Sequence, residues 1–224
     1  MPDFDLGPIW LSLQLAGITT ACLLAVCIPF AWWLSQAPAR LRLPLQTLVS
    51  MPLVLPPSVL GFYLLLLFSP AYWPGRMLKE QLGLTLAFSF PGLVVGSILF
   101  SLPFMMNPLL AGLESLPKSL AEASYVLGKS RWQTLWRVSL PNLKPAILTG
   151  IVLSFAHTMG EFGVVMMIGG KIPGRTRVAS IAIYDEVEAL RFSHAHYYAF
   201  FLFSLSFAVL ITLFAVNRKL LKPF

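Results

Sequence analysis

The chain alternates between long apolar runs that lack charged residues and short segments that carry most of the charge. A helix needs roughly 20 apolar residues to cross the hydrocarbon core of a bilayer. Because lipid offers no partners for backbone N–H and C=O groups, such runs fold as helices. The pattern predicts one transmembrane domain, residues 1–224, with spans at about 9–34, 45–68, 90–113, 146–168 and 197–216.

The apolar stretch around the third span is longer than one crossing requires. It extends over residues 82–113, so a short extra helix near Pro91 can precede the true span. We therefore expect an all-α, polytopic transmembrane helical bundle with five or six spans.

Composition indicates lipid as the main solvent. Of 224 residues, 11% are charged and 57% are hydrophobic, and the mean hydropathy is +0.78. Soluble domains average about 25% charged and about 45–50% apolar residues, so a soluble enzyme is excluded. The net charge of +7 does not indicate a nucleic acid as partner, because Lys and Arg in a membrane protein first reflect topology and anionic headgroups.

The Lys and Arg residues in the connections predict the orientation. With the N-terminus outside, ten of them lie on the inner side and six on the outer side, which agrees with the positive-inside rule. We expect the N-terminus outside and the C-terminus inside. The inner set is Arg40, Arg42, Lys118, Lys129, Arg131, Arg137, Lys144, Arg218, Lys219 and Lys222, and the outer set is Arg76, Lys79, Lys171, Arg175, Arg177 and Arg191.

Prolines interrupt the second and third predicted spans. Pro56 and Pro57 lie in the second span, and Pro103 and Pro108 lie in the third. Each proline removes a backbone donor and clashes with the preceding turn. Because lipid cannot satisfy the freed carbonyls, these stretches pack on protein or line a wet cavity. Two interpretations remain open, namely static kinks in a bundle or broken helices that line a pathway.

The connection 114–141 is the longest on the predicted inner side and carries two helix signals. Ser119 and Glu122 fit a capping box, and Gly128 stands where a helix ends in a left-handed residue, which predicts a helix over 120–127. Ser130 repeats the signal and opens a second helix that Pro141 should stop. The predicted second helix has one apolar stripe, which suits either a docking surface or packing on the chain's own helices, and consists of Trp132, Leu135 and Trp136.

This connection resembles the EAA loop of permease subunits in ATP-binding cassette importers. The residues Glu122-Ala123-Ser124, Gly128 and Val138-Ser139-Leu140-Pro141 match that pattern at every spacing, with Ser124 in place of Ala and Val138 in place of Ile. The resemblance implies a MetI-like permease fold and a cytoplasmic coupling helix that fits a groove on an ATPase subunit. The coupling residues that it implies are Ser119, Glu122, Ala123, Gly128, Leu140 and Pro141.

We expect no nucleotide site, no catalytic residue and no cofactor on this chain. Gly128-Lys129-Ser130 is similar to the end of a Walker A motif, but Ala123 occupies the place of its first glycine and no strand precedes it. The resemblance instead implies two cytoplasmic ATPase subunits that bind ATP and Mg²⁺, a second copy of the permease, and an external oxyanion-binding protein.

Further segments resemble the oxyanion branch of these permeases, and within it the molybdate permeases. They are Met51–Pro57 with Gly61, Met159–Gly163 and Gly169–Thr176. Sulfate and thiosulfate permeases share the segment around Glu161, and these motifs do not separate tungstate from molybdate. The resemblance implies ATP-driven molybdate import by alternating access across the cell (inner) membrane of a bacterium or archaeon.

Glu161 is the only acidic or basic side chain other than histidine inside the predicted spans. A carboxylate in the bilayer costs a few kcal/mol or more, so it should face the protein interior and have a partner. It either lines the pathway at a helix break or is a structural carboxylate that pairs with His157 or with amides of a neighbouring helix. It should not bind a doubly charged anion, which it would repel. The predicted pathway or gating residues are Pro56, Pro57, Gly160, Glu161 and Gly163.

Lys171, Arg175 and Arg177 lie together in the predicted outer connection. They could receive the external binding protein or guide the anion, or they could form an ordinary solvated loop. His194 and His196 form an isolated H-x-H pair, and we expect no metal site there.

Two other classes of function remain as rivals. A secondary carrier would favour internal inverted repeats and several ionisable residues inside the membrane, and the sequence displays neither. A structural membrane subunit that transports nothing would lack an ATPase partner.

Overall fold

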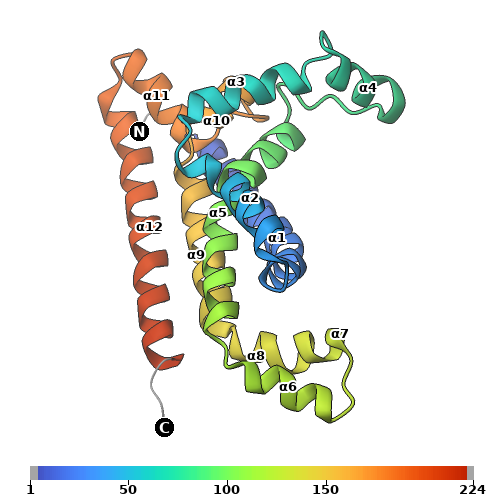
Figure 1. Cartoon of the computed structure of the whole chain (residues 1–224). Coiled ribbons are helices and arrows are strands. Elements are labelled where there is room, and N and C mark those ends of the chain that lie inside the picture. Colours follow the sequence, from blue (N-terminus) through green and yellow to red (C-terminus); the bar gives the residue numbers. More distant parts are fainter. Residues whose placement is uncertain (1–4, 221–224) are drawn as a thin grey trace.

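The computed structural model describes residues 5–220, and it forms helices and no strand within that range (Figure 1). The helices are α1 (Gly7–Ser35), α2 (Ala39–Ser50), the 3₁₀ turn η1 (Met51–Leu53), α3 (Pro57–Phe68), α4 (Trp73–Leu82), α5 (Phe90–Ser115), α6 (Lys118–Val126), α7 (Arg131–Thr134), the π-helix η2 (Leu135–Ser139), α8 (Leu140–Asn142), α9 (Lys144–Gly160), α10 (Gly163–Gly169), α11 (Ala179–Glu188) and α12 (Phe192–Leu220).

Three helices are by themselves long and apolar enough to cross a membrane, namely α1, α5 and α12. They cover the first, third and fifth predicted spans. Two bent pairs also qualify: α2 with η1 and α3, bent by 106°, and α7 and α8 with α9, bent by 76°. Counting each bent pair as one crossing gives up to five spans.

The second predicted span is not one straight helix. The helical path stops between Leu53 and Pro57, where Pro56 has an extended backbone (φ −55°, ψ 133°). Two consecutive prolines cannot donate backbone hydrogen bonds, and each pushes the preceding residue out of the helical region. The proline pair therefore separates α2 and η1 from α3.

The fourth predicted span is also broken. Helix α9 ends at Gly160, Glu161 is extended (φ −67°, ψ 129°), and α10 begins at Gly163. The helix break considered at Glu161, between Gly160 and Gly163, is therefore present within the predicted span 146–168. The short extra helix predicted near Pro91 was wrong, because α5 begins at Phe90 and includes Pro91; a short helix, α4, lies earlier and ends at Leu82.

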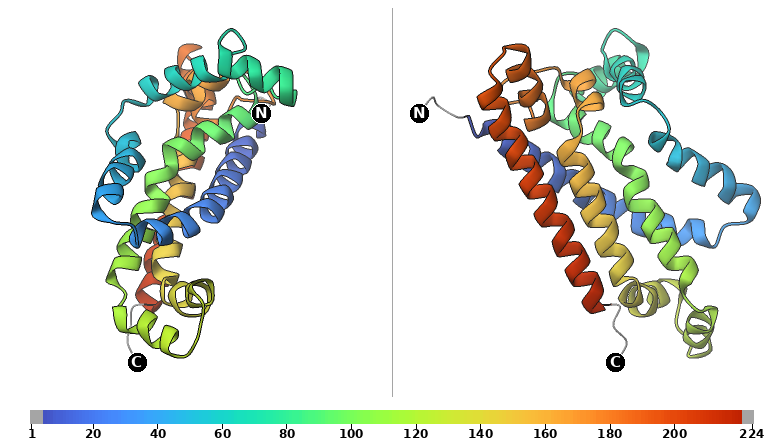
Figure 2. Two further views of the ribbon diagram at one scale, coloured as in Figure 1. Left: turned by 45° about the vertical axis from the view of Figure 1, so that its right-hand side comes forward. Right: turned by 90° about the vertical axis from the view of Figure 1, so that its left-hand side faces the viewer.

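The two ends of the bundle contain different elements (Figures 1 and 2). Helices α3, α4, α10 and α11 lie at the end where α1 begins, whereas α6, α7 and α8 lie at the end where α12 finishes. The hairpin thus shares its side of the membrane with the C-terminal end, as the predicted orientation requires. Lys222, which contributed to that prediction, lies outside the described residues.

The bundle core forms where α1, α5 and α9 pack together. Its best-buried cluster contains Leu23 and Cys27 of α1 and Met105 and Met106 of α5, all with no exposed surface. By contrast, α12 turns a row of large apolar side chains outward, which suits a helix in contact with lipid. These exposed side chains are Phe200, Phe203, Phe207, Ile211 and Phe214.

Candidate functional site

Helix α6 opens the connection between α5 and α9, and it begins earlier than expected. Pro117 occupies its N-cap position with an extended backbone (φ −58°, ψ 129°), and no side chain caps the helix. Ser119 therefore lies inside the first turn, and the predicted capping box of Ser119 and Glu122 was wrong. A proline fixes φ near the helical value and so starts the helix before Ser119 is reached.

The end of α6 matches the prediction for Gly128. This residue has φ +73°, and its N–H donates to the Tyr125 carbonyl at 2.9 Å. The N–H of Lys129 donates to the Ser124 carbonyl at 3.1 Å. These two bonds form a Schellman motif, which closes the helix and fixes the direction of the following chain.

Ser130 caps α7, as its sequence signal predicts. The Gln133 N–H donates to Ser130 Oγ at 3.3 Å, and the Ser130 N–H donates to Gln133 Oε1 at 3.1 Å. The prediction that Pro141 ends this helix was wrong, since α8 continues to Asn142. In the preceding π-helix the N–H of Leu140 reaches back five residues to the Leu135 carbonyl. This wider turn accommodates a proline that has no N–H to donate.

We call residues 116–143 the coupling hairpin. A buried contact of 2.9 Å between Ser124 Oγ and Thr134 Oγ1 joins its two arms. The hairpin also meets the end of α1, where the rings of Trp32 and Trp132 lie 5.5 Å apart. A cavity of about 600 Å³ lies between these parts, and an ion pair between Arg42 and Glu114 lies on its wall.

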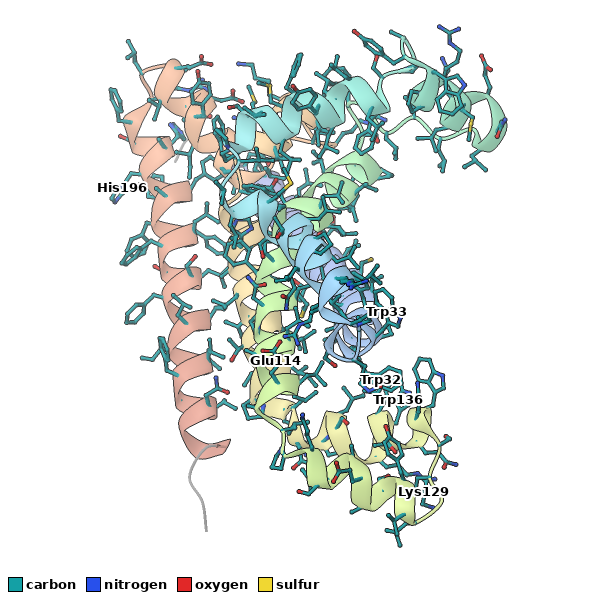
Figure 3. All side chains as sticks on the ribbon, viewed as in Figure 1. Trp32, Trp33, Glu114, Lys129, Trp136 and His196 are labelled. Atoms are coloured by element: carbon teal, nitrogen blue, oxygen red, sulfur yellow. The ribbon has the colours of Figure 1, made fainter. Side chains whose placement is uncertain are left out.

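The predicted coupling residues all lie in this hairpin, and most of them face outward. Glu122, Ala123 and Gly128 are exposed, and Pro141 is exposed near the base. Figure 3 shows Lys129 at the far tip and Trp136 on the side that faces the transmembrane helices. Large apolar side chains are strongly exposed at the tip, including Val126 at 87% and Leu127 at 76%. A rigid, capped helix with an apolar tip is a suitable docking element for another protein.

A second candidate site lies at the break between α9 and α10. A cavity of about 710 Å³ contains four of the five predicted pathway residues in its wall. Pro56 is not part of this wall, although it caps α3 next to it. The wall consists of Pro57, Ser58, Phe100, Ala156, His157, Gly160, Glu161, Phe162 and Gly163.

Glu161 connects three elements at this break. Its side chain is 4% exposed and accepts a 2.8 Å hydrogen bond from Ser97 of α5 through Oε2. Its backbone carbonyl accepts a 2.6 Å bond from the Ser180 hydroxyl of α11. Oε1 has no hydrogen-bond partner within residues 5–220. The break is therefore held by contacts from α5 and α11.

His157 does not pair with Glu161. Its Nδ1 lies 2.9 Å from the hydroxyl of Ser101, and its ring stacks on Phe104 at 4.0 Å. The partner of the Glu161 side chain is instead a group on a neighbouring helix, as the second interpretation proposed. That group is the Ser97 hydroxyl of α5 and not a backbone amide.

Two glycines allow α3 and α10 to pack closely beside this cavity. A Cβ atom on Gly163 would lie 2.6 Å from Cβ of Pro57, and one on Gly61 would lie 2.8 Å from Cβ of Met167. Real Cβ atoms do not approach so closely, so any larger residue there would separate the helices. Gly160 differs, because a Cβ atom there would meet nothing within 4 Å.

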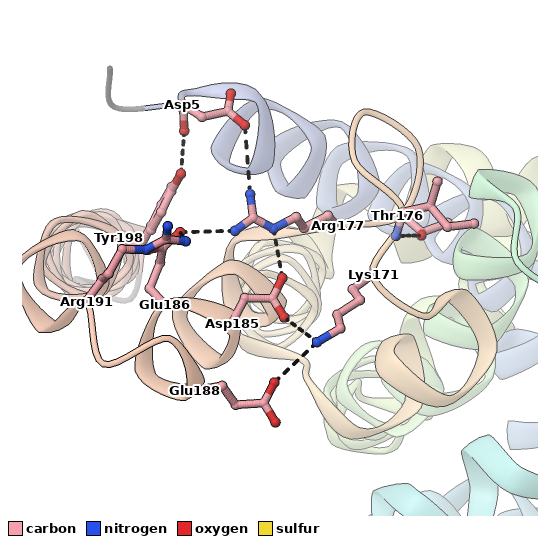
Figure 4. Close-up of polar contacts among 10 residues, drawn as sticks. Asp5, Lys171, Thr176, Arg177, Asp185, Glu186, Glu188, Arg191 and Tyr198 are labelled. Atoms are coloured by element: carbon pink, nitrogen blue, oxygen red, sulfur yellow. Dashed lines mark hydrogen bonds and ion pairs between the residues drawn. The ribbon is translucent and has the colours of Figure 1, made fainter. Parts of the chain in front are cut away.

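The outer connection carries an ion-pair network (Figure 4). Arg177 donates to Asp185 at 2.9 Å and to Glu186 at 3.2 Å, and Lys171 lies 3.2 Å from both Asp185 and Glu188. The hydrogen bonds and charges of Asp185 and Glu188 raise the pKa of the Lys171 amine. Burial opposes the charge of Arg177, but Asp185 and Glu186 outweigh it and raise the pKa of that guanidinium. Lys171 and Arg177 are thus engaged within the chain.

Arg175 is exposed, and no ion pair to it occurs in the described part of the chain. The loop beside it is fixed by Thr176, whose hydroxyl donates to the Gly169 carbonyl at 2.7 Å and accepts from the Ile172 N–H at 3.1 Å. His196 projects from α12 and stacks on Phe200 (Figure 3).

Sequence reasoning missed several hydroxyl residues that hold these sites together. Ser97 and Ser101 are four residues apart in an apolar helix, and Ser180 follows the outer loop. Polar residues at helical spacing within a transmembrane run usually face other helices, so the serine pair was a usable signal. Ser180 had no comparable signal, because its role depends on the position of α11.

Comparison with known proteins gives a consistent result. A family model described as "Binding-protein-dependent transport system inner membrane component" matches residues 18–223. The molybdenum transport system permease protein ModB of Azotobacter vinelandii is 44% identical over 219 residues, which is 97% of this chain and 96% of that protein. A probable sulfate transport system permease protein cysT of Chlorokybus atmophyticus is 34% identical over 169 residues, 75% of this chain and 58% of that one.

A solved structure shows the same fold. The structure titled as inward facing conformations of the MetNI methionine ABC transporter superimposes with a TM-score of 0.74 and 14% sequence identity. The match covers 98% of this chain and 97% of that chain. The all-α, MetI-like permease architecture that the sequence predicts is confirmed.

Proposed function

Because the chain belongs to the family of binding-protein-dependent transport system inner membrane components, we propose that it is the permease of an ATP-driven importer that carries molybdate by alternating access. The chain is a multi-pass membrane protein. Its substrate is proposed from the relationship with the molybdenum transport permease, which extends over nearly the whole length of both proteins.

The coupling hairpin is the observation that best supports coupling to ATP hydrolysis. The turn between α6 and α7 is closed by the Schellman motif at Gly128 and by the Ser130 cap, the two arms are joined by Ser124 and Thr134, and Val126 and Leu127 are exposed at the tip. The hairpin lies at the end of the bundle where the C-terminal helix finishes. An apolar projection held in a fixed orientation can enter a groove on another protein and transmit its movement.

The proposed assembly contains two copies of this chain and two cytoplasmic ATPase subunits that bind ATP and Mg²⁺. An external oxyanion-binding protein delivers the anion, and the complex lies in the cell (inner) membrane of a bacterium or archaeon. Hydrolysis takes place on the ATPase subunits, which meet the hairpin around Glu122, Ala123 and Gly128. Of the three basic residues considered for docking, Arg175 is the best candidate for contact with the binding protein, because Lys171 and Arg177 are paired within the chain.

The cavity beside Glu161 is the proposed part of the pathway. Its wall includes Pro57, Gly160, Glu161 and Gly163, and its titratable side chains are Glu161 and His157, with no Lys or Arg. A dianion that meets no fixed cation there is not held tightly, which suits passage better than storage.

Uptake by the reconstituted complex tests this function. Proteoliposomes with the permease, its ATPase and its binding protein should accumulate radiolabelled molybdate only when ATP is hydrolysed. Tungstate should compete, and sulfate in equal excess should compete poorly. Accumulation without ATP would indicate a secondary carrier, and failure to co-purify an ATPase would favour a structural subunit.

A sulfate permease is the second candidate, favoured by the 34% identity to the probable sulfate permease. That relationship covers 58% of the relative, in contrast to 96% for the molybdenum relative. Strong competition by sulfate, with molybdate ineffective, would establish this second candidate in place of the first.

A further inference from the structure

Helix α4 has one apolar face and one charged face. Successive residues of a helix are about 100° apart, which places the apolar side chains of α4 on one half of its surface. Gln81 is the polar exception on that half. The apolar half carries Trp73, Met77, Leu78 and Leu82, the opposite half carries Arg76 and Lys79, and Glu80 lies at the border beside Trp73.

The apolar face of α4 is not covered by the described part of the chain. Trp73 is 75% exposed, Met77 is 41% exposed and Leu82 is 62% exposed. The helix packs mainly against α3, and Figures 1 and 2 show that it projects sideways from the bundle. A helix with this pattern in water would leave a costly apolar surface in contact with solvent.

The position of α4 in the chain places it at the surface of the membrane. It follows the apolar α3 after four residues and precedes the spanning α5 by seven residues, 83–89. The end of α3 and the start of α5 therefore lie at the same side of the bilayer. Helix α4 cannot be far from the level at which the hydrocarbon region gives way to headgroups.

The start of α4 is fixed tightly to the end of α3, and its own end is closed. A Cβ atom on Gly75 would lie 2.3 Å from the Ser69 carbonyl oxygen, so the two backbones touch there. At the other end Gly83 has φ +63°, and its N–H donates to the Lys79 carbonyl at 3.1 Å. The orientation of the apolar face is thus set by the backbone.

We propose that α4 lies in the lipid–water interface of the outer leaflet, with Trp73 and Met77 in the acyl region and with Arg76 and Lys79 at lipid phosphate groups. Aromatic residues favour this level of the bilayer, and Tyr72 and Trp73 open the helix. Two cations on the charged face and one anion at its border leave a net positive charge, which complements anionic headgroups. Because α3 carries Pro57 and Ser58 of the cavity at its other end, this contact anchors a helix that borders the pathway.

Spin labels at matched positions on the two faces of α4 test the proposal. In the complete complex, with Cys22 and Cys27 replaced by Ala, one label is attached to Met77→Cys and another to Lys79→Cys, which lies on the opposite side of the helix. After reconstitution into bilayers, oxygen should relax the Met77 label more than a water-soluble nickel complex does, and the Lys79 label should show the reverse order. Equal exposure of both labels to nickel would overturn the proposal.

Three further results distinguish lipid from other occupants. Strong dipolar broadening between Met77 labels of two copies would show a contact between permeases and overturn the lipid assignment. Protection of the Met77 label only after addition of the external binding protein would overturn it as well. Phosphatidylglycerol should deepen the Met77 label relative to phosphatidylcholine, and the double variant Arg76→Gln and Lys79→Gln should lose this difference. Equal depth in both lipids with the native residues would overturn the role of the two cations.

Discussion

The Ser97 hydroxyl on α5 donates a 2.8 Å hydrogen bond to Oε2 of Glu161, which lies 64 positions further along the chain at the end of α9. This is the single hydrogen bond to the side chain of Glu161 within residues 5–220, since Oε1 has no partner there. The contact crosses the interface between two transmembrane helices and sits beside the proposed pathway. Loss of the Ser97 hydroxyl would therefore leave the buried carboxyl group of Glu161 without a hydrogen bond.

Replacing Ser97 by Ala should destabilise the complex. The change leaves a buried carboxyl group without its hydrogen bond, which costs about 1–3 kcal/mol. Glu161→Gln should cost less, because the amide oxygen can still accept from Ser97. Thermal unfolding of the purified complex measures both effects. Ser115→Ala serves as control, since that exposed hydroxyl bonds only to its own helix at the Gly112 carbonyl. Equal midpoints for Ser97→Ala and the control would contradict the prediction.

Gly163→Ala should reduce uptake several-fold, whereas Gly160→Ala should have little effect. The two glycines flank the same break, but only the methyl group at position 163 would collide with Pro57, at 2.6 Å. The collision separates α3 from α10 and changes the shape of the cavity. The measurement is the initial rate of ATP-dependent uptake at equal amounts of membrane-inserted protein. If both variants transport at the wild-type rate, close packing at this point is unimportant.

Gly128→Val should uncouple ATP hydrolysis from uptake. Valine in the left-handed conformation costs roughly 1–2 kcal/mol, so the Schellman motif at the end of α6 should open. The exposed Val126 and Leu127 then lose their fixed orientation. Gly128→Asn is the matched control, because asparagine tolerates the left-handed region. The ratio of anion imported to ATP hydrolysed should fall for valine and be largely retained for asparagine. A wild-type ratio in the valine variant would refute this account.

Substitution of Arg177 should lower stability, whereas substitution of Arg175 should affect only the response to the binding protein. Arg177→Gln removes one of two partners of Asp185, which keeps Lys171, and one of two partners of the buried Glu186, which keeps Arg191, and we expect a loss of about 1.5–3 kcal/mol of stability. Arg175→Gln should leave stability unchanged and weaken stimulation of the ATPase by the anion-loaded binding protein. Thermal unfolding and stimulated ATPase rates separate the two effects. If Arg175→Gln is stimulated like the wild type, the binding protein does not use this residue.

Much of the architecture could be predicted from hydrophobic pattern alone. The charge-free runs around 9–34, 90–113 and 197–216 correspond to α1, α5 and α12, because a membrane permits few structures other than helices. The break in the second span was suggested by Pro56 and Pro57, but its angle of 106° depends on packing between α3 and α10. Local sequence does not encode that angle.

The break in the fourth span was one of two interpretations of Glu161 and its flanking glycines, and the sequence did not decide between them. Gly160 and Glu161 lie within an apolar run that resembles one crossing. What ends α9 there is a set of contacts from Ser97 and Ser180, which come from distant parts of the chain. Tertiary contacts of this kind outweigh local helix propensity.

The two capping signals in the hairpin show that a nearby proline can decide whether a serine caps a helix. Ser119 and Ser130 are each followed three residues later by Glu or Gln, and only Ser130 caps a helix. Pro117 precedes the first signal and begins α6 two residues earlier. A search for the capping pattern alone treats both serines as equivalent, whereas the proline decides between them.

The second arm of the hairpin, residues 131–142, meets α9 at a bend of 76°. The hairpin therefore extends sideways from the axis of α9. A force applied at Val126 and Leu127 acts far from Leu143, where the direction changes, and so exerts a torque on α9 instead of a simple push. The other end of α9 is Glu161, which Ser97 and Ser180 hold. A modest displacement of the hairpin tip can therefore rotate the wall of a cavity at the opposite end of the same helix.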